Sequence, residues 1–137
     1  MEITVLDKSN YLKGLLIIAK KDNKLTEPEK KIIRNIAVKL GFATDFYEET
    51  LKGLIANKYI FDDSIIFSDK KIAKSFVCDG LRLAFSDGID PESEVKWVKK
   101  IAISNNIDKS WFEEKYNQYK SSKHIFPTTE FALYSII

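Results

Sequence analysis

Four carboxylates recur at matching places in the two halves of this 137-residue chain. Residues 15–51 align with residues 80–116 at a constant shift of 65 without a gap, and ten of the 37 aligned pairs are identical. The alignment places Asp22 on Asp87 and Glu29 on Glu94. Clustered carboxylate oxygens are the ligands that Ca²⁺ and Mg²⁺ take in proteins. If the two halves pack together, the four residues could form one cation site.

Each half carries its two acidic residues in a turn that leads into a helix. The turns contain Asn23 and Gly88, two residue types that tolerate a positive φ and let the chain reverse. An EF-hand needs a longer loop with more widely spaced ligands, whereas residues 22–29 and 87–94 span only eight positions each. We therefore expect that a bound Ca²⁺ or Mg²⁺ ion would be held weakly, or would need both loops.

The same carboxylates also have a purely structural interpretation. Thr26 is a candidate N-cap and Glu29 its reciprocal partner, so that the two form a capping box. Asp22 and Asp87 can accept hydrogen bonds from backbone N–H groups in their own turns. A third interpretation, a metal-dependent hydrolase, needs a base beside the metal, and the only histidine, His124, lies outside both repeats. Cation binding, a metal-free interaction scaffold and hydrolysis are the functions left open.

The apolar residues follow a helical spacing through nearly the whole chain, which predicts an all-α fold. In the first half, the second predicted helix begins at the N-cap Thr26 and ends before Gly41, and a third covers roughly 44–57. In the second half, Asp90 or Pro91 is expected to begin the equivalent helix.

Two further apolar segments are too hydrophobic to be exposed linkers. We expect a short helix or packed turn over 58–68 and a final packed helix over 128–137, although short apolar runs are also typical of strands. The whole is predicted to be one domain, 1–137. It would contain two pseudo-symmetric three-helix repeats, about 8–57 and 73–121, plus a C-terminal helix.

The charge balance gives no sign of a nucleic-acid partner. The chain has 22 Lys+Arg against 20 Asp+Glu, a net charge of +2, and so lacks the basic excess of a phosphate-binding protein. Met1 to Val5 does not begin a signal peptide, and no apolar run approaches the roughly 20 residues that span a bilayer. We expect a cytoplasmic protein without a transmembrane segment.

Other side chains outside the acidic motif also have candidate roles. Cys78 is the only cysteine, which suits a reducing compartment, and its place on an apolar helix face predicts a small core residue. Trp97, Trp111 and Phe112 are expected to anchor the core of the second repeat, and one of the three could instead be exposed for a protein partner.

The repeated motif resembles the A-x-x-D-G-x-(I/L)-x-x-x-E signature of the TerB-like proteins, which are tellurite-resistance-associated bacterial domains. The matching residues are Ala19-x-x-Asp22-Asn23-x-Leu25-x-x-x-Glu29 and Ala84-x-x-Asp87-Gly88-Ile89-x-x-x-x-Glu94. Asn23 replaces the usual glycine, and Ile89 comes one position early.

This resemblance implies a duplicated helical fold and a non-catalytic module. The family's proposed role is that of an acidic, divalent-cation-responsive component of stress-response or membrane-associated complexes. Carried over to this chain, the acidic positions are Asp22, Glu29, Asp87 and Glu94. The partner would be an unidentified protein, and any membrane association would be peripheral. Nothing in the motif indicates chemistry on tellurium compounds.

Overall fold

A computed structural model describes residues 3–20, 26–43, 65–86, 91–122 and 132–135, together with 45, 46, 48, 49 and 52. All regular elements in these residues are helices, as the spacing of apolar residues predicts. None of the described helices combines the length and apolar character needed to cross a membrane.

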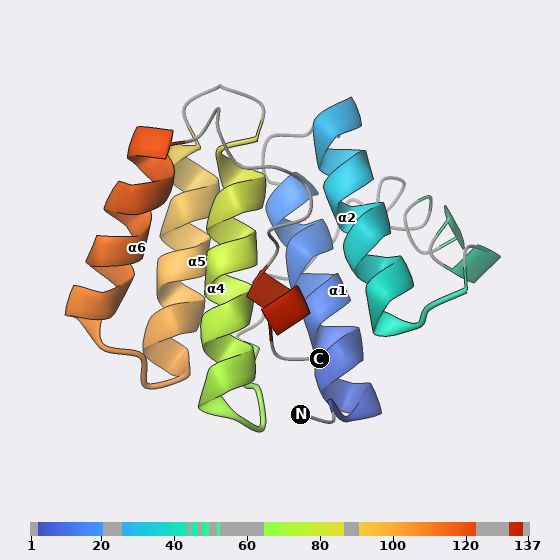
Figure 1. The fold of residues 1–137 in the computed structure, drawn as a ribbon, viewed down its shortest axis with the longest axis horizontal. Coiled ribbons are helices and arrows are strands. Elements are labelled where there is room, and N and C mark those ends of the chain that lie inside the picture. Colours follow the sequence, from blue (N-terminus) through green and yellow to red (C-terminus); the bar gives the residue numbers. More distant parts are fainter. Residues whose placement is uncertain are drawn as a thin grey trace.

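Two helices that run in the same direction form the centre of the molecule (Figure 1). They are α1 (Val5–Lys20) and α4 (Lys70–Ala84). The Tyr11 ring contacts the Phe76 ring near one end of the contact, and Ile18 approaches Gly80 further along. Because both residue numbers rise together, the two helices are parallel.

Three more helices flank this pair (Figure 1). Helix α2 (Glu27–Leu40) packs on α1, whereas α5 (Glu92–Ser104) and α6 (Lys109–Ser122) pack on α4 and on each other. In Figure 1, α2 and α5 both begin at the end of the bundle where α1 and α4 finish. The described residues of the predicted third helix, 45, 46, 48, 49 and 52, are helical.

One continuous hydrophobic core joins the two halves of the chain. Its largest fully buried side chains come from α1, α2, α4 and α5: Tyr11, Leu15, Leu16, Ile17, Ile18, Ile33, Ile36, Ile72, Phe76, Leu81, Leu83 and Ile101. These are the positions at which an apolar side chain recurs every three or four residues, so each helix buries one face.

The ends of α2 confirm the prediction from its sequence. Thr26 and Glu29 form the capping box, and Gly41 ends the helix at φ 92°. Helix α5 ends in a similar way, with Asn106 at φ 59°. Its N-cap is Pro91, one of the two residues predicted to begin the helix. Asp90 lies outside the described residues.

Buried polar side chains hold the segment that leads into α4. Asp7 accepts hydrogen bonds from the Ser68 backbone N–H, at 3.0 Å, and from the Ser68 hydroxyl. Asn105 accepts from the Phe67 N–H at 2.9 Å and donates to the Ile65 carbonyl at 2.8 Å. These hydrogen bonds therefore hold residues 65–68, which are not helical, against α1 and the end of α5.

The two apolar segments outside the repeats pack partly as predicted. Residues 65–67 are non-helical, with Ile65 and Phe67 buried but Ile66 57% exposed; residues 58–64 lie outside the described part. In the C-terminal segment the described element is a four-residue 3-10 helix, η1 (Ala132–Ser135), not an α-helix.

Candidate functional site

The four predicted ligands fall into two groups. Glu29 and Glu94 are both the third residue of their helices, and only 1% and 4% of their surfaces are exposed. Asp22 and Asp87 lie outside the described residues. Within the described ranges, no group of three or more His, Cys, Asp or Glu side chains could hold a metal ion. The structure therefore bears on two of the four carboxylates.

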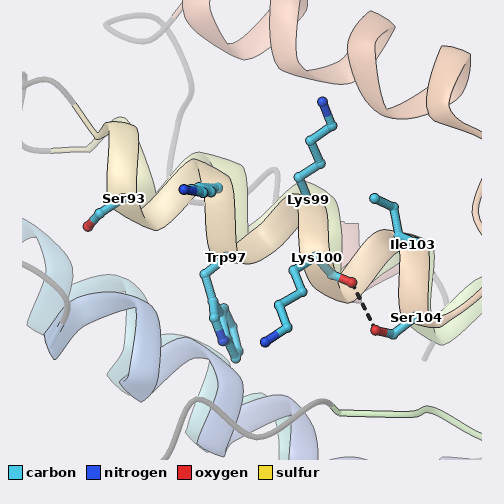
Figure 2. Close-up of a pocket in the computed structure, with 7 residues that line it drawn as sticks. Ser93, Trp97, Lys99, Lys100, Ile103 and Ser104 are labelled. Atoms are coloured by element: carbon cyan, nitrogen blue, oxygen red, sulfur yellow. Dashed lines mark hydrogen bonds between the residues drawn. The ribbon is translucent and has the colours of Figure 1, made fainter.

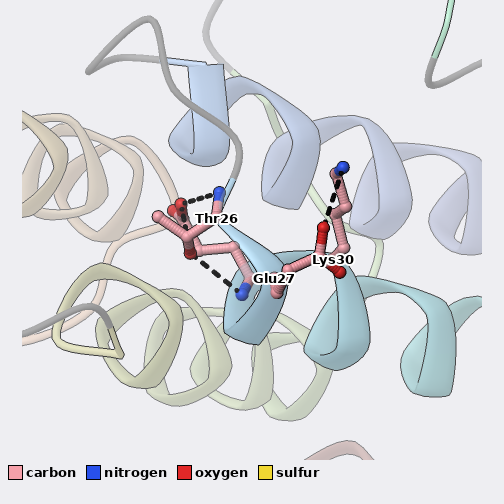
Figure 3. A network of polar contacts seen from close by, with 4 residues as sticks. Thr26, Glu27 and Lys30 are labelled. Atoms are coloured by element: carbon pink, nitrogen blue, oxygen red, sulfur yellow. Dashed lines mark hydrogen bonds and ion pairs between the residues drawn. The ribbon is translucent and has the colours of Figure 1, made fainter.

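Glu29 has a defined structural role in the capping box of α2 (Figure 3). Its Oε1 accepts from the Thr26 N–H at 3.0 Å and from the Thr26 hydroxyl at 2.9 Å, while the Glu29 N–H donates to Thr26 Oγ1 at 3.2 Å. These bonds satisfy backbone donors that a helix start leaves without partners. The exposed Glu27 pairs with Lys30 at 3.3 Å one turn along.

Glu94 is buried for a different reason. Its N-cap is Pro91, which has no backbone N–H to donate and makes no side-chain cap hydrogen bond. Glu94 therefore cannot make the reciprocal capping bond that Glu29 makes, although it does interact with another group. Because a buried carboxylate costs free energy unless it is compensated, an interaction other than a capping box must offset the burial of Glu94.

A second cluster of polar side chains was not predicted from the sequence. Asp79 is fully buried on α4, where its carboxylate accepts from the Tyr11 hydroxyl and from the backbone N–H groups of Ala132, at 2.7 Å, and Leu133, at 3.1 Å. The Tyr11 hydroxyl also lies 2.8 Å from Ser75 Oγ. A carboxylate of α4 thus joins α1 to the C-terminal 3-10 helix.

Burial changes the acidity of this cluster. It raises the pKa of Asp79 to about 6, although the hydrogen bonds from Tyr11, Ala132 and Leu133 oppose the rise. Burial and the nearby Asp79 charge also raise the pKa of Tyr11 well above its ordinary value. One signal in the sequence could have revealed the cluster, because Asp79 interrupts the apolar face of its helix.

Cys78 borders the same cluster and is half-buried rather than a full core residue, which corrects the prediction. Burial, followed by the Asp79 charge, raises the pKa of its thiol to about 11. A nucleophilic cysteine needs a lowered pKa, whereas the surroundings of Cys78 raise it. Its hydrogen-bond partner Tyr119 also has a raised pKa, mainly because of burial.

A groove of about 570 Å³ runs along α5 (Figure 2). Trp97 and Ile103 supply its apolar surface, and Lys96, Lys99 and Lys100 its charge. Trp97 is 4% exposed, as expected of a core anchor, whereas Ile103 is 60% exposed. The groove was not predicted, because the sequence indicates Trp97 as a core anchor and does not show that it lines one surface with the lysines around it.

Comparison of the chain with protein-family models, with curated proteins and with solved structures finds no match. The resemblance to the TerB-like proteins therefore stays a prediction carried by the residues quoted above.

Proposed function

We propose that this chain is a non-catalytic helical module of the TerB-like type, built from two copies of a three-helix repeat. Its acidic loops bind a divalent cation, and its surface engages a protein partner in a bacterial stress-response complex. The observation that carries the proposal is the burial of Glu29 and Glu94 at the same position of two helices that begin at the same end of the bundle.

The helix positions support a duplicated architecture. Helices α1 and α4 begin 65 residues apart, at 5 and 70, and α2 and α5 begin 65 residues apart, at 27 and 92. The bonds that close α2 and α5 correspond as well. Phe42 N–H donates to the Ala37 carbonyl and Ile107 N–H to the Ala102 carbonyl, both at 3.0 Å. This closure is the Schellman type, which places a left-handed residue just past the helix.

The contact between α1 and α4 supports a two-fold relation between the copies. A Cβ atom on Gly14 would lie 2.4 Å from the Phe76 ring, so this ring occupies the space above the glycine. The positions 65 residues away are Asp79 and Tyr11, which are joined by a hydrogen bond. The two contacts therefore exchange when the copies are exchanged, as a two-fold axis requires.

The cation site is inferred from charge and position. Two buried carboxylates at one end of the bundle provide hard oxygen atoms, and Asp22 and Asp87 precede them by seven residues each. Calcium takes 6–8 oxygen ligands and magnesium keeps several waters, so four carboxylates with water would suffice for either.

An NMR titration of labelled protein with Ca²⁺, and then Mg²⁺, tests the proposal. Saturable shifts are expected in the amides of 26–30 and 91–95, and Asp22→Asn combined with Asp87→Asn should abolish them. Glu27→Gln is the matched control, because Glu27 lies in the same helix turn as Glu29 but is exposed. Unchanged spectra up to millimolar metal would contradict the cation site.

A metal-free interaction scaffold is the second candidate, and the capping box of Glu29 favours it. On this hypothesis, the aspartates only cap their turns. Asp22→Asn with Asp87→Asn would then lower the free energy of unfolding equally in Ca²⁺ and in EDTA. Thermal unfolding in both buffers separates the two functions, because a cation that binds only the folded protein raises its stability.

A further inference from the structure

The groove along α5 combines one exposed apolar side chain with several lysines. Ile103 is 60% exposed, whereas Trp97 is 4% exposed and contributes only a small part of its surface. Figure 2 shows Trp97 and Lys100 extending on one side of α5 and Lys99 and Ile103 on the other. The groove therefore offers one exposed apolar side chain, Ile103, among charged ones.

The charge of the groove is of one sign. The described residues that line it include three lysines and no acidic side chain. Lys99 pairs with Glu113 of α6 at 3.3 Å, whereas in the described part of the chain neither Lys96 nor Lys100 has an ion pair. Since the whole chain carries a net charge of only +2, this is a local concentration of positive charge rather than a general property of the surface.

These observations indicate an acidic ligand with an apolar side chain. A nucleic acid would need a broader basic footprint, which the charge balance of the chain does not provide. Residues 93 and 104 are separated by about 17 Å along the helix, at roughly 1.5 Å per residue. A peptide segment of roughly 12 residues is long enough to follow that distance.

We propose that the groove along α5 binds an acidic segment of a partner protein, with an apolar side chain against Ile103 and carboxylates at Lys96 and Lys100. The inference rests on the proposed role as a protein-interaction module and assigns the surface and the partner chemistry. Charge complementarity would supply specificity and fast association.

Selection from a random peptide library of roughly 12 residues, with the full chain in EDTA, tests the assignment. Enriched peptides should combine Asp or Glu with a large apolar residue. Their affinity can be measured from the fluorescence of Trp97 in a Trp111→Phe background, which removes the only other tryptophan. Replacing the acids of an enriched peptide by their amides should weaken binding by roughly tenfold or more.

The decisive variant is Lys96→Glu with Lys100→Glu, which should weaken the enriched peptides roughly tenfold or more. The matched control is Lys31→Glu with Arg34→Glu, because these exposed residues lie on α2 at the positions equivalent to 96 and 99. Equal affinity for the two double variants would overturn the assignment. So would enrichment of non-acidic peptides, or tighter binding of single-stranded oligo-dT than of any selected peptide.

The two proposals fail separately. Peptide binding is measured in EDTA at the α5 groove, and the cation titration is measured without peptide at 26–30 and 91–95. Loss of peptide binding with an intact cation response would reject only the groove, and the reverse result would reject only the cation site.

Discussion

Tyr11 on α1 and Phe76 on α4 occupy positions 65 residues apart, but the surroundings of one side chain are polar and those of the other are apolar. The two rings contact each other edge to face at 5.4 Å. Phe76 extends over Gly14, where there is no side chain. Tyr11 ends on the carboxylate of Asp79 and beside the hydroxyl of Ser75. The contact of Phe76 with Gly14 is therefore apolar, and the contact of Tyr11 with Asp79 is polar.

The difference between these contacts has a structural consequence. Only the polar contact contains a carboxylate, and the oxygens of this carboxylate also accept hydrogen bonds from the N–H groups of Ala132 and Leu133. Burying a carboxylate costs free energy. Here the hydrogen bonds from Ala132 and Leu133 offset part of that cost and hold the C-terminal 3-10 helix in place. The apolar contact instead lets α1 and α4 approach closely. One contact sets the spacing of the helices, and the other attaches the C-terminus.

The largest expected effect comes from removing the polar contact with Asp79→Ala. The change leaves three donors, from Tyr11, Ala132 and Leu133, without their acceptor. At roughly 1–2 kcal/mol for each of these, the free energy of unfolding at pH 4, where the contribution of Asp79 is complete, should fall by about 3 to 6 kcal/mol, measured by urea denaturation.

Asp79→Asn is the matched control, since its amide keeps the shape and an acceptor oxygen. It should cost much less than alanine and leave the Ala132 and Leu133 amides protected from hydrogen exchange. If both variants lost equal stability while these amides stayed protected in each, the attachment of the tail by Asp79 would be disproved.

The next largest effect is a dependence of the free energy of unfolding on pH. It amounts to about 3 kcal/mol, because the pKa of Asp79 is about two pH units higher in the folded state than its ordinary value. The folded pKa of Asp79 is about 6, above its ordinary value of 3.8. Between these values the folded state keeps a proton that the unfolded state has released. The contribution of Asp79 to stability is therefore complete below about pH 4 and is lost as the pH rises through 6.

Wild type and Asp79→Asn separate this contribution from that of the other carboxylates. The difference between their free energies of unfolding should shift against the wild type from pH 4 to pH 7. Parallel curves over that range would mean that Asp79 titrates normally in the folded protein.

Much of the fold could be predicted because its determinants are local. Apolar spacing, the Thr26 capping box and the stop at Gly41 each depend on residues within one helix. The Tyr11–Asp79 contact joins residues 68 apart, and the Ala132–Asp79 bond joins residues 53 apart. No periodicity links positions at such distances, so the partners of Asp79 and the 3-10 geometry of the tail could not be predicted, although Asp79 itself interrupts an apolar helix face.

The candidate site was predictable to the same limited degree. Spacing placed Glu29 and Glu94 at equivalent helix positions, and the capping box gave Glu29 its role. Burial of Glu94 could not be foreseen, because Pro91 cannot form that box. The groove could not be predicted, because only the folded helix shows that Trp97, Ile103 and Lys96 line one surface.

The apolar contact can be broken with Gly14→Ala, at about 1 to 2 kcal/mol. The new Cβ would lie 2.4 Å from the Phe76 ring, which is fully buried and has little room to move. The better helix propensity of alanine offsets part of this cost. Chemical denaturation of Gly14→Ala, with and without Phe76→Leu, should give a positive coupling, because the smaller side chain relieves the clash.

Gly80→Ala is the control for the loss of a helix glycine. Its Cβ would lie 3.0 Å from the flexible end of Ile18 and 3.3 Å from Val98 Cγ2, farther from its neighbours than the Cβ at position 14. This variant should cost less than Gly14→Ala. A loss equal to that of Gly14→Ala would indicate that the Phe76 contact does not set the spacing of α1 and α4.

The smallest and sharpest change is Tyr11→Phe, which gives α1 the same ring that α4 has at Phe76. It removes one hydrogen bond to Asp79 and should cost about 1 kcal/mol. Because that bond holds the pKa of Asp79 down, its loss should also move the pH-dependent fall in stability above pH 6. A purely steric role for the hydroxyl would lower stability equally at every pH. The unfolding curves of Tyr11→Phe across pH 4 to 8 therefore test whether this one hydroxyl makes the polar contact different from its apolar counterpart.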